Sequence, residues 1–287
     1  MSPTMPTSDT MAARLFDLWS PVYLLLISLS CLPTTLISHP LLPLQPRQFQ
    51  LAWFGNLWKH LGPQMALSPE QIPYISKLFG RAKGTVLELG PGTGDQMRHF
   101  SNTGVVQSGQ VERVVGAEPN AVLHGKLKLN AAAAGLSPEK GRYIVLEAGA
   151  EPASLIPALH KARLYPTSTS EYAGTEGVFD TIMCVKSMCS APQDQMREIV
   201  STIQTLLKPG GEFLFFEHVA NDQDMLTMAW AWLLGWIWPV AMGNCHLNGR
   251  VDKVVKEVGG WSVVDVRNTR EYRGWNVFRY VVGVCKK

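Results

Sequence analysis

Cysteine is scarce in this chain of 287 residues, and its spacing suggests ordinary thiols. The five cysteines are odd in number and contain no C-x-x-C pair; they are Cys31, Cys184, Cys189, Cys245 and Cys285. This arrangement favours neither a disulfide framework nor a zinc site. We therefore expect no metal, and reduced thiols in a domain that faces the cytosol.

Charged residues are also few, at 17% of the chain, with a net charge of +3. No block of basic residues is present, which argues against nucleic acid as a partner. The hydrophobic content of 46% is typical of a globular protein and argues against long disordered stretches. The length suits one substantial domain with an appendage.

Between Asp17 and Arg47 charged residues are missing altogether. The apolar run over residues 21–37 approaches the shortest length that crosses a bilayer, although prolines from Pro33 onward argue against a long straight helix. We interpret residues 1–48 as a tail and a hydrophobic membrane anchor, either spanning or hairpin. A cleaved signal peptide and a buried soluble element are the alternatives. A slight basic excess after the run favours a cytosolic domain, and we expect the endoplasmic reticulum membrane.

Residues 49–80 precede the main domain and contain two predicted elements. The aromatic-rich stretch 49–65 is expected to lie at a bilayer surface or to cover a pocket. The sequence Ser68-Pro69-Glu70-Gln71 predicts a capping box with proline at the first helical position. We expect the short helix that it starts to end near Gly80.

A glycine-rich turn at residues 90–94 organises the rest of the chain. The apolar run 85–89 predicts a buried parallel strand, and a helix is predicted to open at Asp95. Glycines between a strand and a helix leave backbone N–H groups free and let a ligand approach the main chain. The dinucleotide fingerprint needs its third glycine at position 95, but the third glycine here is Gly94.

Further strands and helices alternate along residues 81–287. The polar, turn-rich stretch 165–177 is predicted to be a surface insertion, with a mobile lid as the alternative. Together these patterns predict an α/β fold, a Rossmann-like sheet whose last strands are antiparallel. The predicted strands are 85–89, 111–118, 143–147, 179–187, 212–217, 261–267 and 277–285, and the main helices are 121–134, 193–207 and 251–258.

The acid-x-Gly-x-Gly-x-Gly order of residues 88–94, with the Lys208-Pro209-Gly210-Gly211 turn, resembles class I S-adenosylmethionine (SAM) methyltransferases. The stretches 215–220 (FFEHVA) and 243–247 (GNCHL) resemble the membrane-anchored thiol methyltransferases of the methyltransferase-like seven group and related enzymes of fungal specialised metabolism. The resemblance implies the seven-stranded methyltransferase fold with SAM as cofactor. It implies these cofactor-binding residues: Glu88, Gly90, Gly92, Gly94, Glu118, Pro119, Asn120, Ala150, Glu151 and Val185.

Candidate catalytic residues follow the fifth predicted strand. Glu217 and His218 lie at its carboxyl end, where open α/β sheets bind ligands, and His246 is predicted to approach the same mouth. A histidine suits a general base near neutral pH, although each could equally be a structural histidine. Cys245 is expected to pack rather than to act as a nucleophile.

The charge-free stretch 225–242 is long enough to resemble a second membrane span. A crossing there would separate the last two strands from the first five. We therefore expect residues 225–247 to form an interfacial segment that covers the substrate pocket, with plain core packing as the alternative.

The leading hypothesis is a membrane-associated enzyme that transfers a methyl group from SAM to sulfur or nitrogen of a lipophilic small molecule. An N- or O-methyltransferase of a peptidic or polyketide natural product is the alternative within enzymes. A catalytically silent, SAM-binding membrane adaptor is the alternative from another class.

Overall fold

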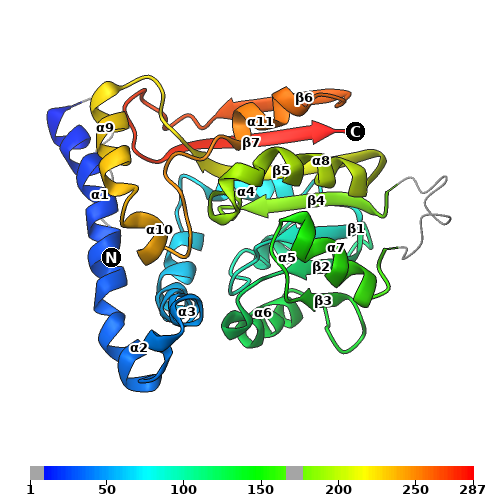
Figure 1. Ribbon diagram of the computed structural model, residues 1–287. Helices are drawn as coiled ribbons and strands as arrows, with labels where there is room; N and C mark the ends of the chain where they lie inside the picture. The colour runs from blue at the N-terminus through cyan, green and yellow to red at the C-terminus, as the bar shows by residue number, and fades with distance from the viewer. Residues whose placement is uncertain (1–9, 166–176) are drawn as a thin grey trace.

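The computed structural model describes residues 10–165 and 177–287, and its centre is a seven-stranded sheet in the order β3-β2-β1-β4-β5-β7-β6 (Figure 1). Strand β7 is antiparallel to both of its neighbours, and the other pairs are parallel. The predicted methyltransferase fold is confirmed. The strands are β1 (Gly84–Leu89), β2 (Val111–Ala117), β3 (Tyr143–Leu146), β4 (Phe179–Val185), β5 (Leu207–Val219), β6 (Val263–Asn268) and β7 (Arg279–Lys286).

Helices cover both faces of the sheet, because successive side chains of each strand point to opposite faces. Leu87 packs into the cluster formed with α7 (Pro152–Lys161), α8 (Met196–Leu206) and α11 (Val251–Val258). Its neighbour Val86 packs into the opposite cluster, with α4 (Ile72–Phe79), α5 (Arg98–Asn102) and α6 (Ala121–Ala133). The central strands are thus apolar on both sides, as the sequence predicts.

Two helix starts differ from their predictions. The capping box is wrong: α4 begins at Ile72 without a side-chain cap, and the Ser68 hydroxyl donates to the Glu70 carboxylate at 2.9 Å. The helix after the glycine turn begins at Arg98 rather than at Asp95, since the Asp95 carboxylate accepts a hydrogen bond from the Thr93 hydroxyl within the turn. The predicted surface insertion lies almost wholly outside the described residues.

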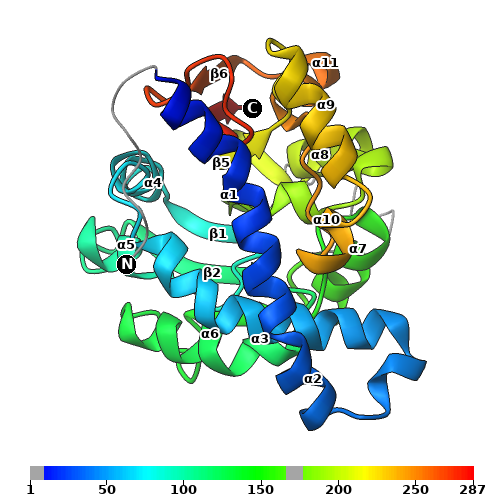
Figure 2. The same cartoon turned by 90° about the vertical axis from the view of Figure 1, so that its left-hand side faces the viewer.

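The N-terminal helices form a further layer against the end of the sheet (Figures 1 and 2). They are α1 (Met11–Ser30), α2 (Leu32–Ser38), the 3-10 turn η1 (Leu42–Leu44) and α3 (Pro46–Ala66), and they pack with α9 (Met225–Leu234) and α10 (Trp238–Ala241). Helix α3 begins before residue 49, so it continues across the predicted boundary. A third hydrophobic cluster, with Trp53, Leu57 and Trp238 among its buried members, holds this layer together.

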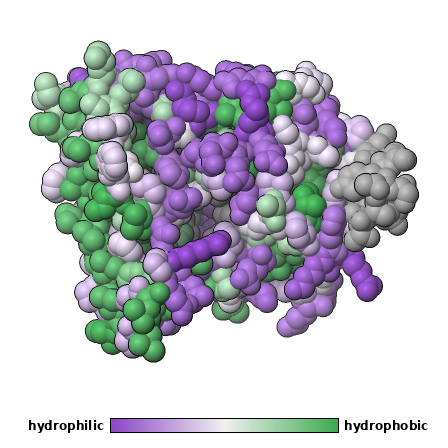
Figure 3. Space-filling view, viewed as in Figure 1, coloured by the Kyte–Doolittle hydropathy of each residue, from purple (hydrophilic) through white to green (hydrophobic). Residues whose placement is uncertain are grey.

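The outer face of this layer is apolar. Within the described ranges, Met11–Ser38 is the one helical stretch that is long and apolar enough to cross a membrane. Leu15, Leu26 and Leu29 of α1 are exposed, as are Trp232 of α9 and Trp236 just after it. Figure 3 shows hydrophobic residues gathered along this side of the molecule.

Candidate active site

A cavity of about 1480 Å³ lies between the carboxyl ends of the strands and the N-terminal helical layer. Its walls come from α1, α3, the glycine turn and the segments that follow β2, β3, β4 and β5. This edge of an open α/β sheet is where ligands bind. All of the predicted cofactor residues except Glu88 and Gly94 line this cavity.

The glycine turn is the floor of one end of the cavity. Gly90 and Gly92 have positive φ angles of 64° and 60°. A Cβ atom on Gly90 would lie 2.5 Å from Cβ of Ser187, and one on Gly92 would lie 2.6 Å from Nε1 of Trp58. Glycine is therefore required here both by the backbone conformation and by close neighbours. Helix α3, which carries Trp58, packs over the turn, and several of its residues line the cavity.

Glu118 joins the glycine turn to the start of α6. Its Oε2 accepts a hydrogen bond from the Gly92 N–H at 2.8 Å, and its Oε1 accepts one from the Asn120 N–H at 2.9 Å. Burial raises the pKa of Glu118, while these two hydrogen bonds lower it. Each carboxylate oxygen has two lone pairs, so Glu118 retains acceptor capacity toward the cavity that it lines.

Glu88 and Gly94 lie behind the cavity wall. Glu88 is buried, and no described residue bonds to its Oε2. Burial, and then the nearby charge of Glu118, raise the pKa of Glu88 to about 8. A buried carboxyl without a partner, next to a glycine turn, suits a cationic group such as an ammonium. Gly94 has a packing role instead, because a Cβ there would lie 2.8 Å from Leu127.

Of the three predicted catalytic residues, the structure places only His218 in the cavity wall. Glu217 is fully buried, and its Oε1 accepts hydrogen bonds from the N–H groups of Ser187 at 2.7 Å and Met188 at 3.0 Å. It thereby holds the segment that packs against Gly90. His246 is half-buried, and burial lowers its pKa. Its backbone N–H donates to the Cys189 carbonyl at 2.8 Å.

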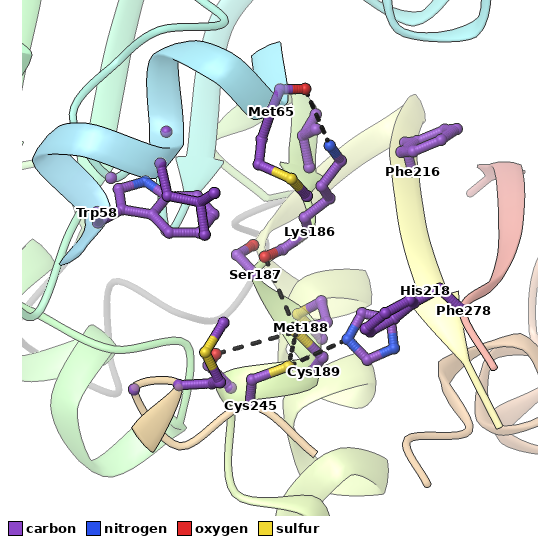
Figure 4. A pocket seen from close by; sticks show the side chains of 18 of the residues that line it. Trp58, Met65, Lys186, Ser187, Met188, Cys189, Phe216, His218, Cys245 and Phe278 are labelled. Carbon is purple, nitrogen blue, oxygen red and sulfur yellow. Dashed lines mark hydrogen bonds between the residues drawn. The ribbon is translucent and has the colours of Figure 1, made fainter. Parts of the chain in front are cut away.

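The structure brings His218 together with two cysteines that the sequence analysis did not connect. Nε2 of His218 lies 3.1 Å from Sγ of Cys245, which lies 3.3 Å from Sγ of Cys189 (Figure 4). Burial lowers the pKa of His218. The Cys189 thiol and the Glu217 carboxylate together raise it by more than burial lowers it, so the pKa lies above its usual value. All three side chains line the cavity.

Residues 58–245, more than half of the chain, match the family model of the methyltransferase domain. The chain belongs to the class I SAM-dependent methyltransferases. Its cofactor is SAM.

Curated relatives of this methyltransferase include two thiol S-methyltransferases. TMT1B of Rattus norvegicus is 30% identical over 78 residues, which cover 27% of this chain and 31% of that protein. TMT1A of Homo sapiens is 25% identical over 113 residues, which cover 39% of this chain and 45% of that protein. Neither match covers as much as half of the relative.

Solved structures show the same fold at lower identity. An O-methyltransferase family protein from Burkholderia thailandensis superposes with a TM-score of 0.55 and 18% identity, covering 99% of this chain and 75% of that one. A putative O-methyltransferase from Nostoc punctiforme gives a TM-score of 0.52 and 15% identity, covering 82% and 60% of the two chains.

The methyltransferase also has a lysine in its cavity that the sequence analysis did not single out. Lys186 follows β4 with a positive φ of 56°, and its Nζ lies 3.4 Å from the Met65 carbonyl oxygen. Burial lowers the pKa of Lys186 to about 8, although the charges of Glu217 and Cys189 act against this shift. Its place at the carboxyl end of a central strand is the signal that could have identified it.

Proposed function

We propose that this methyltransferase transfers the methyl group of SAM to sulfur or nitrogen of a lipophilic small molecule, with a thiol as the favoured acceptor. The observation that carries the proposal is the shape of the cavity, which runs from the glycine turn to apolar residues of α1 and α3. An apolar acceptor that enters past Trp19, Tyr23 and Phe54 would approach one end of the bound cofactor. The thiol S-methyltransferase activity of the two curated relatives favours sulfur.

The cofactor residues divide between the parts of SAM. Gly90, Gly92 and the unpartnered Glu88 would hold the methionine portion, and Glu118 would accept hydrogen bonds from the ribose hydroxyls. Ala150 and Glu151 follow β3 and line the cavity where the adenine would lie. When bound, SAM supplies an electrophilic methyl group on a sulfonium.

The acceptor side needs alignment, exclusion of water and removal of a proton. Methyl transfer from a sulfonium loses charge as the bond forms, so an apolar wall favours it. His218 and Lys186 are the titratable side chains placed to receive or stabilise charge there. A thiol ionises more readily than a hydroxyl and needs less help from a base.

We also propose that the enzyme binds a membrane surface through the outer face of α1 and α9. Exposed aromatic side chains with apolar neighbours are typical of interfacial helices. Trp232 is 69% exposed and Trp236 is 75% exposed, which is far above what a packed tryptophan shows. Because α1 both presents this face and lines the cavity, an acceptor dissolved in the bilayer would have a short path to the cofactor.

The test is an acceptor screen on the full chain in detergent or vesicles with radiolabelled SAM. Octanethiol, octylamine and octanol present sulfur, nitrogen and oxygen on the same apolar chain. We expect turnover with the thiol, the amine or both, and at least tenfold less with the alcohol. Methylation of the alcohol at an equal rate would contradict the proposal. SAM binding without turnover of any acceptor would favour the silent adaptor instead.

A further inference from the structure

We propose that Cys189, His218 and Cys245 form a zinc site whose fourth coordination position opens into the acceptor end of the cavity. Nothing in the spacing of these residues predicts it. Cys245 is 56 positions from Cys189 and 27 from His218, so only the folded chain brings them together.

The geometry matches the requirements of zinc. The Nδ1/Nε2 and Sγ atoms of the three side chains all lie within 4.8 Å of one another, with the closest pairs at 3.1 Å and 3.3 Å. Zinc binds thiolate at about 2.3 Å and imidazole at about 2.0 Å, so tetrahedral ligand atoms lie roughly 3.5–3.8 Å apart. The two closest pairs need to open by only about half an ångström to reach these separations.

Each ligand comes from a well-held segment. Cys189 lies in a 3-10 turn (Met188–Ser190) that Glu217 holds through the Met188 N–H. His218 lies within β5, opposite Tyr280 of β7, and its ring packs against Phe278 at 5.7 Å between centroids. Cys245 follows α10, and its N–H donates to the Met242 carbonyl. A preformed arrangement of this kind is what a metal site needs.

The chemistry of the donors selects the metal. Two thiolates and one imidazole are soft and borderline ligands that favour zinc over magnesium or calcium. Three protein ligands with one open position are typical of catalytic rather than structural zinc. The open position faces the cavity, because all three residues line it.

The role of the ion rests on the proposed function. A thiol acceptor occupies the fourth position and releases its proton to solvent. Its sulfur then attacks the methyl carbon of SAM, forming a carbon–sulfur bond while the bond from that carbon to the sulfonium breaks. The products are a thioether and neutral S-adenosylhomocysteine, and the thioether, a weak ligand, leaves the zinc. Ser187 packs against Gly90 of the glycine turn and is two residues before Cys189, so it connects the cofactor turn with the proposed zinc site.

The experiment is metal analysis of the reduced full chain after incubation with zinc and removal of the excess. We expect about one zinc per chain in the parent and less than a tenth of that in Cys189→Ser and Cys245→Ser. Cys285→Ser removes a buried thiol that does not line the cavity and should retain the metal. Parent protein that binds no zinc, or serine variants that keep it, would overturn the proposal.

Cobalt substitution gives a readout that does not depend on variants that fold poorly. Cobalt in the parent should show the intense visible bands of a tetrahedral site and a thiolate charge-transfer band. Addition of octanethiol should increase that charge-transfer band if the fourth position is open. A spectrum of hexaaqua cobalt alone would overturn the site.

The two proposals fail in different ways. Zinc bound at one per chain without thiol methylation would leave the site standing and refute the proposed acceptor. Thiol methylation at the full rate by zinc-free enzyme would refute the role of the ion while leaving the acceptor standing.

Discussion

The Asp17 carboxylate accepts a 2.7 Å hydrogen bond from the backbone N–H of Val277, although the two residues are 260 positions apart. The side-chain amide of Asn276 donates to the same carboxylate at 3.2 Å, and Asp17 is buried. Farther along α1, the Ser28 hydroxyl donates to the Ala241 carbonyl at 2.6 Å. Helix α1 is thus docked on the catalytic domain along its length, which favours an interfacial helix over a free membrane span.

Asp17→Ala should destabilise the fold. The substitution leaves the buried Val277 N–H without a partner, which costs about 1–3 kcal/mol. Denaturant unfolding in mild detergent should show this loss. Glu198→Ala, an exposed acid on α8, is the control and should change the free energy of unfolding little. Equal stability of Asp17→Ala and the parent would mean that α1 does not dock in solution.

Replacing both Trp232 and Trp236 by serine should weaken membrane binding without changing the affinity for SAM. Both side chains are exposed, so their removal takes apolar area from the proposed interface and not from the core. We expect the vesicle partition coefficient to fall at least about tenfold in a flotation assay. Serine at Val263 and Val264, which are exposed on β6, is the matched control. Unchanged flotation of the tryptophan variant would show that the membrane interface lies elsewhere on the protein.

Glu118→Gln should weaken SAM binding at least about tenfold while the fold remains. Glutamine keeps the volume, but its single carbonyl oxygen cannot accept from both Gly92 and Asn120 and still bond to a ribose. Calorimetry measures the effect directly. Glu112→Gln changes an exposed acid on β2, the strand that Glu118 follows, and should bind SAM as the parent does. Parent-like affinity of Glu118→Gln would exclude a ribose contact.

The stability of the enzyme without cofactor should fall as the pH rises, because of Glu88. Folding raises its pKa from 4.5 to about 8, so its charged form is disfavoured in the folded state. The contribution of Glu88 to the free energy of unfolding is therefore greatest below pH 4.5. It falls between pH 4.5 and about 8 and is constant at higher pH. Glu88→Gln removes this dependence. Unfolding curves measured from pH 5.5 to pH 8 should show that the difference in free energy of unfolding between parent and variant changes with pH. An equal difference at every pH would contradict the prediction.

Lys186→Gln should slow thiol methylation in a pH-dependent way. Below its pKa of about 8 the ammonium favours a thiolate in the cavity, and above it the amine is neutral. We expect kcat/KM at pH 7 to fall at least about fivefold in the variant, and the two enzymes to converge near pH 9. A constant ratio across the pH range would indicate that Lys186 only packs in the cavity wall.

Local patterns in the sequence predicted much of the fold and the cofactor side of the site. The apolar run that ends at Leu89, the glycines after it and the acid Glu118 follow from strand burial and turn geometry, which neighbouring residues decide. The capping box failed for a local reason too, since the Ser68 hydroxyl bonds to a side chain instead of a backbone N–H. The sequence alone does not show whether the Ser68 hydroxyl bonds to the side chain or to the backbone.

The acceptor side was decided by tertiary structure. Alternation along β5 separates Glu217 from His218, but only the sheet order shows which of them meets the cavity. The strand pattern, the glycine turn and the apolar N-terminus could be predicted from the sequence, because each depends on contacts within a few residues. The docking of α1 and the meeting of Cys189, His218 and Cys245 depend on distant segments packed by the completed sheet, and no local pattern encodes that packing.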